Sequence, residues 1–155
     1  MKIALGADHA GFELKNKIKS WLAEQGIATA DEGTNSSDSV DYPDYARKVA
    51  EDVAAQRADL GILVCGTGIG MAISANKVPG IRAANADSEF AAQMAREHNN
   101  ANVLTLGARI VDEAQARKIV DRYLHTQFAA GRHQTRVDKI MAIETEERAS
   151  WKQPG

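Results

Sequence analysis

The chain is poor in several residue types, and each shortage excludes a class of protein. It has one cysteine, Cys65, in 155 residues, so it can form no intrachain disulfide and no cysteine-rich zinc or iron–sulfur centre. Only 5% of its residues are aromatic. A domain of this length must therefore pack its core from Val, Ile, Leu and Ala, the side chains that fill the layers of α/β proteins.

The sequence also lacks a charge excess and any long apolar run. Its 19 basic and 21 acidic residues give a net charge of −2, whereas binding to a phosphate backbone needs a positive excess on one face. No run approaches the roughly 18 apolar residues of a membrane span. The apolar stretch after Lys2 is too short for the core of a signal peptide. We therefore expect a single cytoplasmic domain over residues 1–155, with no nucleic-acid or membrane partner.

Short apolar runs alternate with segments of helical period. The runs predict strands at residues 3–6, 27–30, 60–65, 81–84 and 102–107. The run from Leu60 to Cys65 is apolar without alternation, which is typical of a central parallel strand covered on both faces. This alternation predicts a three-layer α/β/α sandwich with a five-stranded parallel, Rossmann-like sheet, followed by an extra C-terminal helix from about Arg136.

Turn and capping residues predict where the helices begin and end. Gly26 is placed to end the first helix, and Pro43 suits the first position of the second. Asp87 is expected to cap the fourth helix, which should end near His98. In such a sheet, ligands bind at the carboxyl ends of the strands, where the strand order reverses. If the first strand lies between the second and the third, Asp8-His9 comes to lie beside the segment 65–67.

The loop Gly66-Thr67-Gly68-Ile69-Gly70 is the sharpest local feature. Three glycines between a buried strand and a helix allow backbone N–H groups to converge on an anion, although such a loop can also be a plain tight turn. The dinucleotide fingerprint fails because Met71 stands where its third glycine belongs, and no P-loop Gly-Lys-Ser/Thr follows. Met71 also occupies the position of the arginine that a cysteine phosphatase needs.

Several side chains near these turns are candidates for chemistry. Cys65 directly precedes the glycine loop, where clustered amides stabilise a thiolate that can act as a nucleophile or a general base. Its alternative is an inert, buried small residue. His9 lies next to Asp8, and its alternative is a solvated loop histidine. His98 lies at a helix end, where a histidine can simply stabilise the helix.

A second group of candidates is basic. Arg132 and Arg136 are four residues apart, with His133 between them, and Arg109 follows the last strand. Arginines on an exposed helix face are usually solvated. In a chain of net negative charge, however, such a local cluster also has the chemistry that a phosphate monoester requires.

Taken together, these segments resemble one family, the ribose-5-phosphate isomerase B family. The resemblance is carried by residues 6–11, 41–46, 65–71, 75–77, 80–84, 98–99 and 131–133, in order, and extends to about Ile140. It implies interconversion of ribose 5-phosphate and ribulose 5-phosphate through a cis-enediolate, without a metal or organic cofactor. It also implies a homodimer or a dimer of dimers, with each active site shared between two subunits.

The resemblance further implies a role for each matching residue. Cys65 is similar to the base that moves a proton between C1 and C2, and His98 to the group that opens the furanose ring, with Asp8 assisting at the hydroxyls. Thr67 would hydrogen-bond or shuttle a hydroxyl proton. The remaining implied roles are enediolate stabilisation by the amides of Gly66, Thr67, Gly68, Ile69 and Gly70, substrate binding by Asp8, His9, Tyr42 and Asn99, and phosphate binding by His9, Arg109, Arg132 and Arg136.

Two alternatives remain open at this point. The same scaffold and chemistry serve six-carbon substrates such as allose 6-phosphate or galactose 6-phosphate, and a non-catalytic sugar-phosphate sensor could share the fold. One subgroup of the family uses a glutamate directly after the last glycine of the loop. Met71 stands there in this chain, which groups it with the members that use cysteine. The segment after Ile140 has no clear counterpart in the family.

Overall fold

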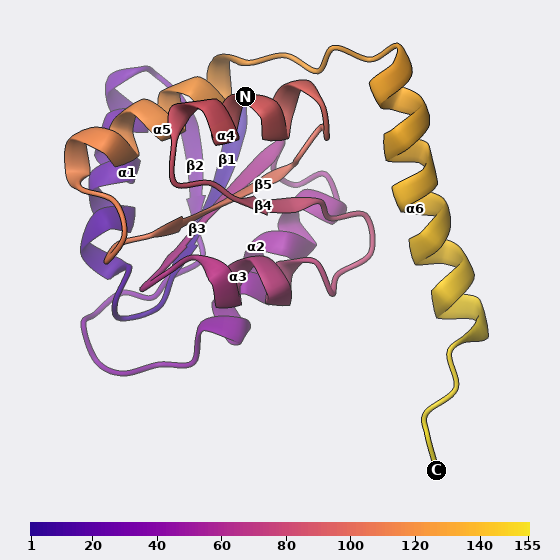
Figure 1. The fold of residues 1–155 in the computed structure, drawn as a ribbon. Helices are drawn as coiled ribbons and strands as arrows, with labels where there is room; N and C mark the ends of the chain where they lie inside the picture. Colours follow the sequence, from indigo (N-terminus) through magenta and orange to yellow (C-terminus); the bar gives the residue numbers. More distant parts are fainter.

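Five parallel strands form one sheet in the order β2-β1-β3-β5-β4, with helices on both sides (Figure 1). The computed structural model describes all of residues 1–155 and confirms the predicted fold class. The elements are β1 (Lys2–Ala7), α1 (Phe12–Glu24), β2 (Ala28–Asp31), α2 (Tyr42–Ala54), β3 (Leu60–Cys65), α3 (Ile69–Ala75), β4 (Ala83–Asn85), α4 (Glu89–Glu97), β5 (Val103–Gly107), α5 (Glu113–His125) and α6 (Arg132–Ser150).

The strand order reverses next to β1, which meets the condition for Asp8-His9 to lie beside residues 65–67. β1 pairs with β2 on one side, where Ile3 lies opposite Thr29, and with β3 on the other, where Ile3 lies opposite Leu60. The turns that follow β1 and β3 therefore leave the same edge of the sheet side by side.

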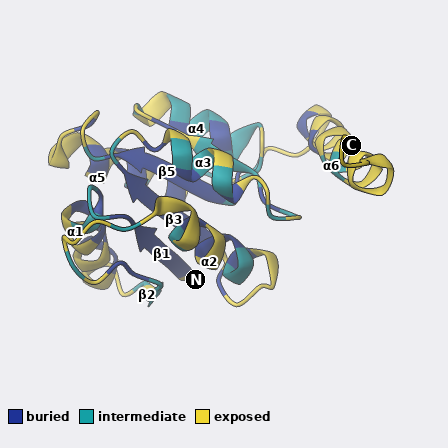
Figure 2. Ribbon diagram, turned by 90° about the horizontal axis from the view of Figure 1, so that it is seen from below, coloured by how far each residue is buried: buried dark blue, intermediate teal, exposed yellow.

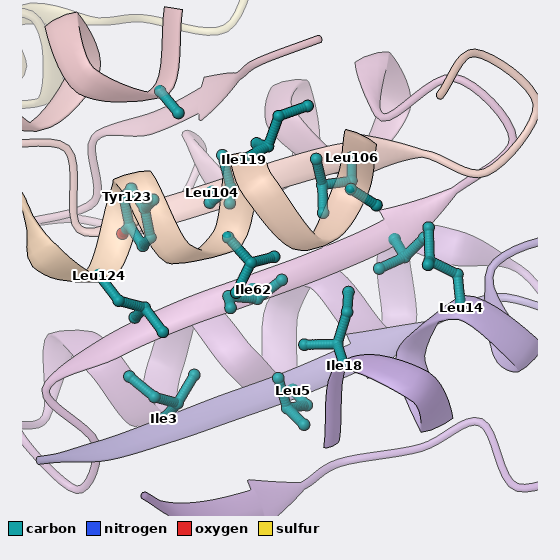
Figure 3. Close-up of a cluster of buried hydrophobic side chains, with 14 of the residues drawn as sticks. Ile3, Leu5, Leu14, Ile18, Ile62, Leu104, Leu106, Ile119, Tyr123 and Leu124 are labelled. Atoms are coloured by element: carbon teal, nitrogen blue, oxygen red, sulfur yellow. The ribbon is translucent and has the colours of Figure 1, made fainter. Parts of the chain in front are cut away.

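Alternation along the strands divides the core into two clusters. Ile62 of β3 faces α1 and α5, and Figure 3 shows it between Ile18 of α1 and Ile119 of α5. Leu63 and Cys65 face the opposite layer, which α2 and α3 form. Every residue of β3 is buried. The strand that carries Cys65 is therefore held on both faces.

Several predicted boundaries are confirmed and others are wrong. Gly26 follows the end of α1 with φ +70°, a conformation that glycine adopts without strain. Ser88, not Asp87, caps α4, because its side chain accepts a hydrogen bond from the Ala91 N–H. Pro43 is the second residue of its helix rather than the first.

The last helix begins at Arg132 rather than near Arg136. Its first turn is polar and largely exposed, so it has none of the periodic apolar residues from which the helix is predicted. The strands keep their predicted places, with ends that differ by one or two residues.

Helix α6 stands apart from the sandwich, joined to α5 by an extended segment (Figure 1), and most of its surface is exposed (Figure 2). A few contacts hold it beside β4. Glu144 accepts a hydrogen bond from the Gly80 N–H at 3.0 Å, and Arg148 donates to the Lys77 carbonyl at 2.8 Å. A groove of about 1030 Å³ lies between α6 and the sandwich. None of the helices is both long and apolar enough to cross a membrane.

Candidate active site

Cys65 ends β3 and begins the glycine loop. Its side chain is 4% exposed, and its Sγ accepts a hydrogen bond from the Gly68 N–H at 3.1 Å. An N–H directed at sulfur stabilises negative charge on it. The Ile69 N–H donates to the hydroxyl of exposed Thr67 at 3.3 Å. Two of the five loop amides therefore already have partners within the loop.

Asn85, at the end of β4, braces this loop, and sequence reasoning missed it. Its side-chain amide donates to the Thr67 carbonyl at 3.3 Å, and its Oδ1 accepts from the Thr105 hydroxyl at 3.1 Å. The available signal was a polar residue at the carboxyl end of a strand, the edge where ligands bind. Gly68 fits beneath Asn85 with φ +81°.

We expect Gly68→Ala to destabilise the protein more than a matched glycine change. A Cβ at residue 68 would lie 2.2 Å from the Asn85 Oδ1 and 2.9 Å from the Leu106 carbonyl carbon. Gly80 has a similar φ of +85° but open space around it, so Gly80→Ala isolates the backbone cost of about 1–2 kcal/mol. Gly68→Ala should cost about 1–3 kcal/mol more, measured by urea unfolding. Equal losses would show that the loop yields to the added carbon.

The turn after β1 packs directly on the end of β3. The Asp8 N–H donates to the Val64 carbonyl at 3.2 Å, so Asp8 lies next to the Cys65 segment, as the strand order predicts. Asp8 is 6% exposed. Its Oδ1 accepts from the N–H groups of Ala10 and Gly11 at 3.0 and 3.1 Å. The carboxylate is thus fixed by its own turn, and Oδ2 is left for a ligand.

His9 is oriented by a neighbouring loop. Its Nδ1 accepts a hydrogen bond from the Val40 N–H at 3.1 Å, which requires that nitrogen to be unprotonated. The ring proton is therefore on Nε2, where it can be donated to an anion or a hydroxyl.

Tyr42 and Arg109 complete the group at this edge. The Tyr42 ring lies against Gly70, so close that a Cβ there would come within 2.6 Å of it. The Arg109 guanidinium lies over Gly66, with Nη1 3.1 Å from the position of an added Cβ. Both predicted site residues therefore flank the loop.

The other predicted residues, His98, Asn99, Arg132 and Arg136, lie elsewhere. His98 and Asn99 follow α4, which returns the chain to the amino ends of the strands. The ring of His98 stacks on that of His133 in the first turn of α6, with centroids 4.1 Å apart and planes 9° apart. Arg132 and Arg136 are exposed on the same part of α6.

The pKa of His133, one ring of the stacked pair, is lowered. Burial of the ring is the main cause that lowers its pKa below the ordinary value of 6.5, and the neighbouring His98, Arg132 and Arg136 lower the pKa further. His133 is therefore neutral at neutral pH. The His98 ring can lie against it without repulsion between two imidazolium charges.

Within one chain, the length of a strand separates the residues around the Cys65 loop from those around His98. Cys65 pairs with Gly107 at the carboxyl end of β5, whereas His98 precedes the amino end of the same strand. Five residues at about 3.3 Å each place roughly 16 Å of strand between the two groups. That span exceeds the ~3 Å reach of a catalytic hydrogen bond many times over.

The structure has no group of three or more His, Cys, Asp and Glu side chains placed to hold a metal ion.

Comparisons with known proteins agree over nearly the whole chain. Residues 3–140 match the family model described as Ribose/Galactose Isomerase. The chain is 50% identical to ribose-5-phosphate isomerase B of Escherichia coli over 143 residues, which cover 92% of this chain and 96% of the relative.

Solved structures give the same picture. Ribose-5-phosphate isomerase B of Clostridium thermocellum superposes with a TM-score of 0.93 at 51% identity, covering 94% of this chain and 99% of the other. The Mycoplasma genitalium enzyme with bound ribulose 5-phosphate gives 0.90 at 46% identity, covering 94% and 97%. The fold, the arrangement of the sheet edge and these matches together show that the chain belongs to the ribose/galactose isomerase family.

Proposed function

We propose that this protein is an aldose–ketose isomerase that interconverts ribose 5-phosphate and ribulose 5-phosphate. One observation carries the proposal: a buried thiol beside the Asp8 turn opens a loop of amides, in a chain that matches the family from residue 3 to residue 140. Relatives that are 50% and 51% identical are named ribose-5-phosphate isomerase B. This reaction belongs to the pentose phosphate pathway.

The chemistry requires a base and a set of hydrogen-bond donors. Cys65, as the thiolate, removes the proton from C2 of the open-chain aldose, and the electron pair forms the C1–C2 double bond of a cis-enediolate while the C1 oxygen becomes negative. The same group returns a proton to C1, a proton moves from O2 to O1, and the ketose results. Nothing is oxidised or reduced overall, so the step needs no redox cofactor.

The loop stabilises the charge that develops on the enediolate oxygens. Gly66, Thr67 and Gly70 supply amides that the loop has not already used, since those of Gly68 and Ile69 have partners. Each well-placed donor to such an oxyanion contributes about 3–4 kcal/mol to the transition state. In this proposal Thr67 and the Oδ2 atom of Asp8 exchange protons with the sugar hydroxyls.

Ring opening and phosphate binding draw on both groups of residues. His98, as an acid or base, opens the furanose ring, and Asn99 binds the substrate. His9 and Arg109 at the loop, together with Arg132 and Arg136, bind the phosphate, where guanidinium forks match its oxygens. Anchoring the phosphate away from the reacting carbons supplies binding energy for the transition state.

We infer that two copies of the chain complete each site. Within one chain the two groups lie at opposite edges of the sheet, so His98, Asn99, Arg132 and Arg136 of one subunit must serve the Cys65 loop of another. The groove beside α6 is bordered by the exposed apolar side chains Ile140, Ile143 and Trp151, a surface typical of subunit contacts. A two-fold homodimer, alone or as a dimer of dimers, satisfies both subunits equally.

The setting of the reaction follows from the same residues. Residues 1–155 act as one domain, and the reaction needs no metal or organic cofactor. The proposed base is a single free thiol, which a reducing compartment such as the cytoplasm keeps active.

An enzyme assay with two sugar phosphates tests the substrate. We expect turnover of ribose 5-phosphate, with kcat/KM at least about tenfold above that for allose 6-phosphate, because one extra carbon must fit the same distance between loop and phosphate site. A reversed preference would make the protein a six-carbon isomerase. Binding of both sugars without turnover of either would favour a sensor.

A further inference from the structure

The turn that carries His98 and Asn99 reverses the chain tightly. Helix α4 ends at Glu97, and the chain must reverse within five residues to enter β5 at Val103. It does so with Asn100 in the left-handed region, at φ 46°. Asparagine adopts this conformation more readily than most other residues and often does so just after a helix.

Arg82, just before β4, fixes the turn through its backbone carbonyls. Its Nε donates to the carbonyls of Asn99 and Asn100 at 3.2 and 3.1 Å, and its Nη2 donates to the Asn100 carbonyl at 2.9 Å. The guanidinium fork thus grips two consecutive peptide groups, the first of which belongs to the residue after His98. A point charge such as an ammonium group could not reach both with this geometry.

A second arginine holds the other side of the same turn. The Nη1 of Arg96 donates to the Asn100 side chain at 2.9 Å and to the Ala101 carbonyl at 2.8 Å. The Tyr123 hydroxyl donates to the Ala101 carbonyl at 3.1 Å. Three successive carbonyls, at residues 99, 100 and 101, are therefore all held by side chains from other elements or from α4 itself.

This arrangement places two cations close together in a half-buried position. Burial lowers the pKa of Arg82, and the positive charge of Arg96 lowers it further, while Glu144 acts in the opposite direction. The Nε of Arg96 is buried with no hydrogen-bond partner. The carbonyls at the end of α4 partly offset the positive charge.

Arg82 also reaches the element that contacts His98 from the other side. Its Nη1 points to the sulfur of Met141 in α6 at 3.4 Å, and the first turn of α6 stacks His133 on the His98 ring. The backbone just after His98 is thus held by Arg82, the His98 ring lies against His133 of α6, and Arg82 itself contacts α6 through Met141.

We propose that Arg82 is a positioning residue for His98. It holds the turn 98–100 so that the imidazole of one subunit projects toward the loop of another at a fixed place. Arg82 itself touches no substrate. The proposal rests on the proposed function, in which His98 opens the sugar ring.

The test is a double-mutant cycle between Arg82 and His98, with ribose 5-phosphate as substrate. Arg82→Met should lower kcat by about ten- to a hundredfold, the cost of a misplaced catalytic group. KM should rise by a smaller factor, because Asn99 lies in the same turn but the proposed phosphate-binding residues are intact. Arg82→Lys should recover only part of the loss. In the His98→Ala background, Arg82→Met should change kcat by less than about twofold.

The control is Arg122→Met, which removes an exposed guanidinium that meets Glu89 at 3.5 Å and should leave kcat within about twofold of the parent. The mass of the assembled protein and its thermal unfolding are measured for every variant. If Arg82→Met does not assemble, Arg82→Lys replaces it in the double-mutant cycle. Equal losses from the Arg82 change in both backgrounds, or no loss in either, would overturn the positioning role. Full activity of His98→Ala would overturn the role proposed for His98, and the positioning role with it.

Discussion

Replacing Cys65 by alanine is expected to lower kcat for ribose 5-phosphate by roughly 10²–10⁴-fold, the contribution of a positioned general base. Cys65 is the proposed base because its thiol is the one titratable side chain of the glycine-loop segment 65–70, while the neighbouring Asp8 carboxylate is held by the N–H groups of its own turn. Binding of the substrate should change little, since the proposed phosphate-binding residues are left intact. The measurement is steady-state turnover together with calorimetric binding of ribose 5-phosphate.

Deuterium exchange makes this prediction specific to the proton transfer. In D2O the wild-type protein should exchange the transferred carbon-bound proton of the sugar phosphate, and Cys65→Ala should not. His98→Ala is the matched comparison, because it leaves the base in place and should still exchange the proton of whatever open-chain sugar is present. Rapid exchange catalysed by Cys65→Ala would mean that another group is the base.

The change should cost only part of the folding stability. The sulfur is buried and accepts one hydrogen bond, from the Gly68 N–H, so leaving that donor without a partner should destabilise the fold by about 1–3 kcal/mol. Thermal unfolding of Cys65→Ala therefore separates a lost base from a lost fold.

The sheet edge that carries Cys65 was predictable from the sequence in part. An apolar run without alternation identifies β3 as central. The pairing of β1 with β3, which the sequence allows but does not fix, brings the turns after these strands together. The Asp8 N–H to Val64 carbonyl bond is the direct consequence. Successive side chains of β3 point to opposite faces of the sheet, and Cys65 lies on the face that α2 and α3 cover.

The other half of the candidate site was harder to place. Periodicity predicts that α6 is a helix. Of its apolar face, however, only Val137 is buried, and Ile140 remains 43% exposed. The pattern therefore does not show what the helix packs against within the chain. Arg82 and Arg96 look like ordinary surface charges in the sequence. Their partners are backbone carbonyls of a turn, and no residue pattern encodes such a contact.

Asn85 illustrates the same limit at the loop itself. A single polar residue at the end of a three-residue strand is too weak a signal to single out. Its importance comes from geometry. The Asn85 side chain lies so close to Gly68 that residue 68 has no space for a Cβ atom. Long-range contacts of this kind depend on the folded sheet rather than on local sequence.

The separation of His98 from Cys65 within one chain leads to the second large effect: two inactive variants should restore activity to each other. Cys65→Ala keeps His98, and His98→Ala keeps Cys65. In a mixed two-fold dimer, one site receives both intact residues and the other receives neither. Random pairing makes half of the dimers mixed, so about a quarter of the wild-type sites should work, against almost none in either parent. The measurement is turnover after the two chains are unfolded together and refolded.

The matched control mixes two variants that damage the same edge of the sheet, Cys65→Ala and Asp8→Ala. Both residues belong to one subunit's share of the site, joined through the Asp8 N–H to Val64 carbonyl bond. Every site in their mixed dimer therefore lacks one residue, and the activity should not exceed the mean of the two parents. Recovery above that mean would show that Asp8 and Cys65 serve the sites of different subunits. No recovery in the first mixture, despite dimers of the right mass, would place His98 and Cys65 of one chain in the same site. About 16 Å of β5 lies between the positions of the two residues within one chain, so a single chain does not bring both to the same sugar and we expect recovery only in the first mixture.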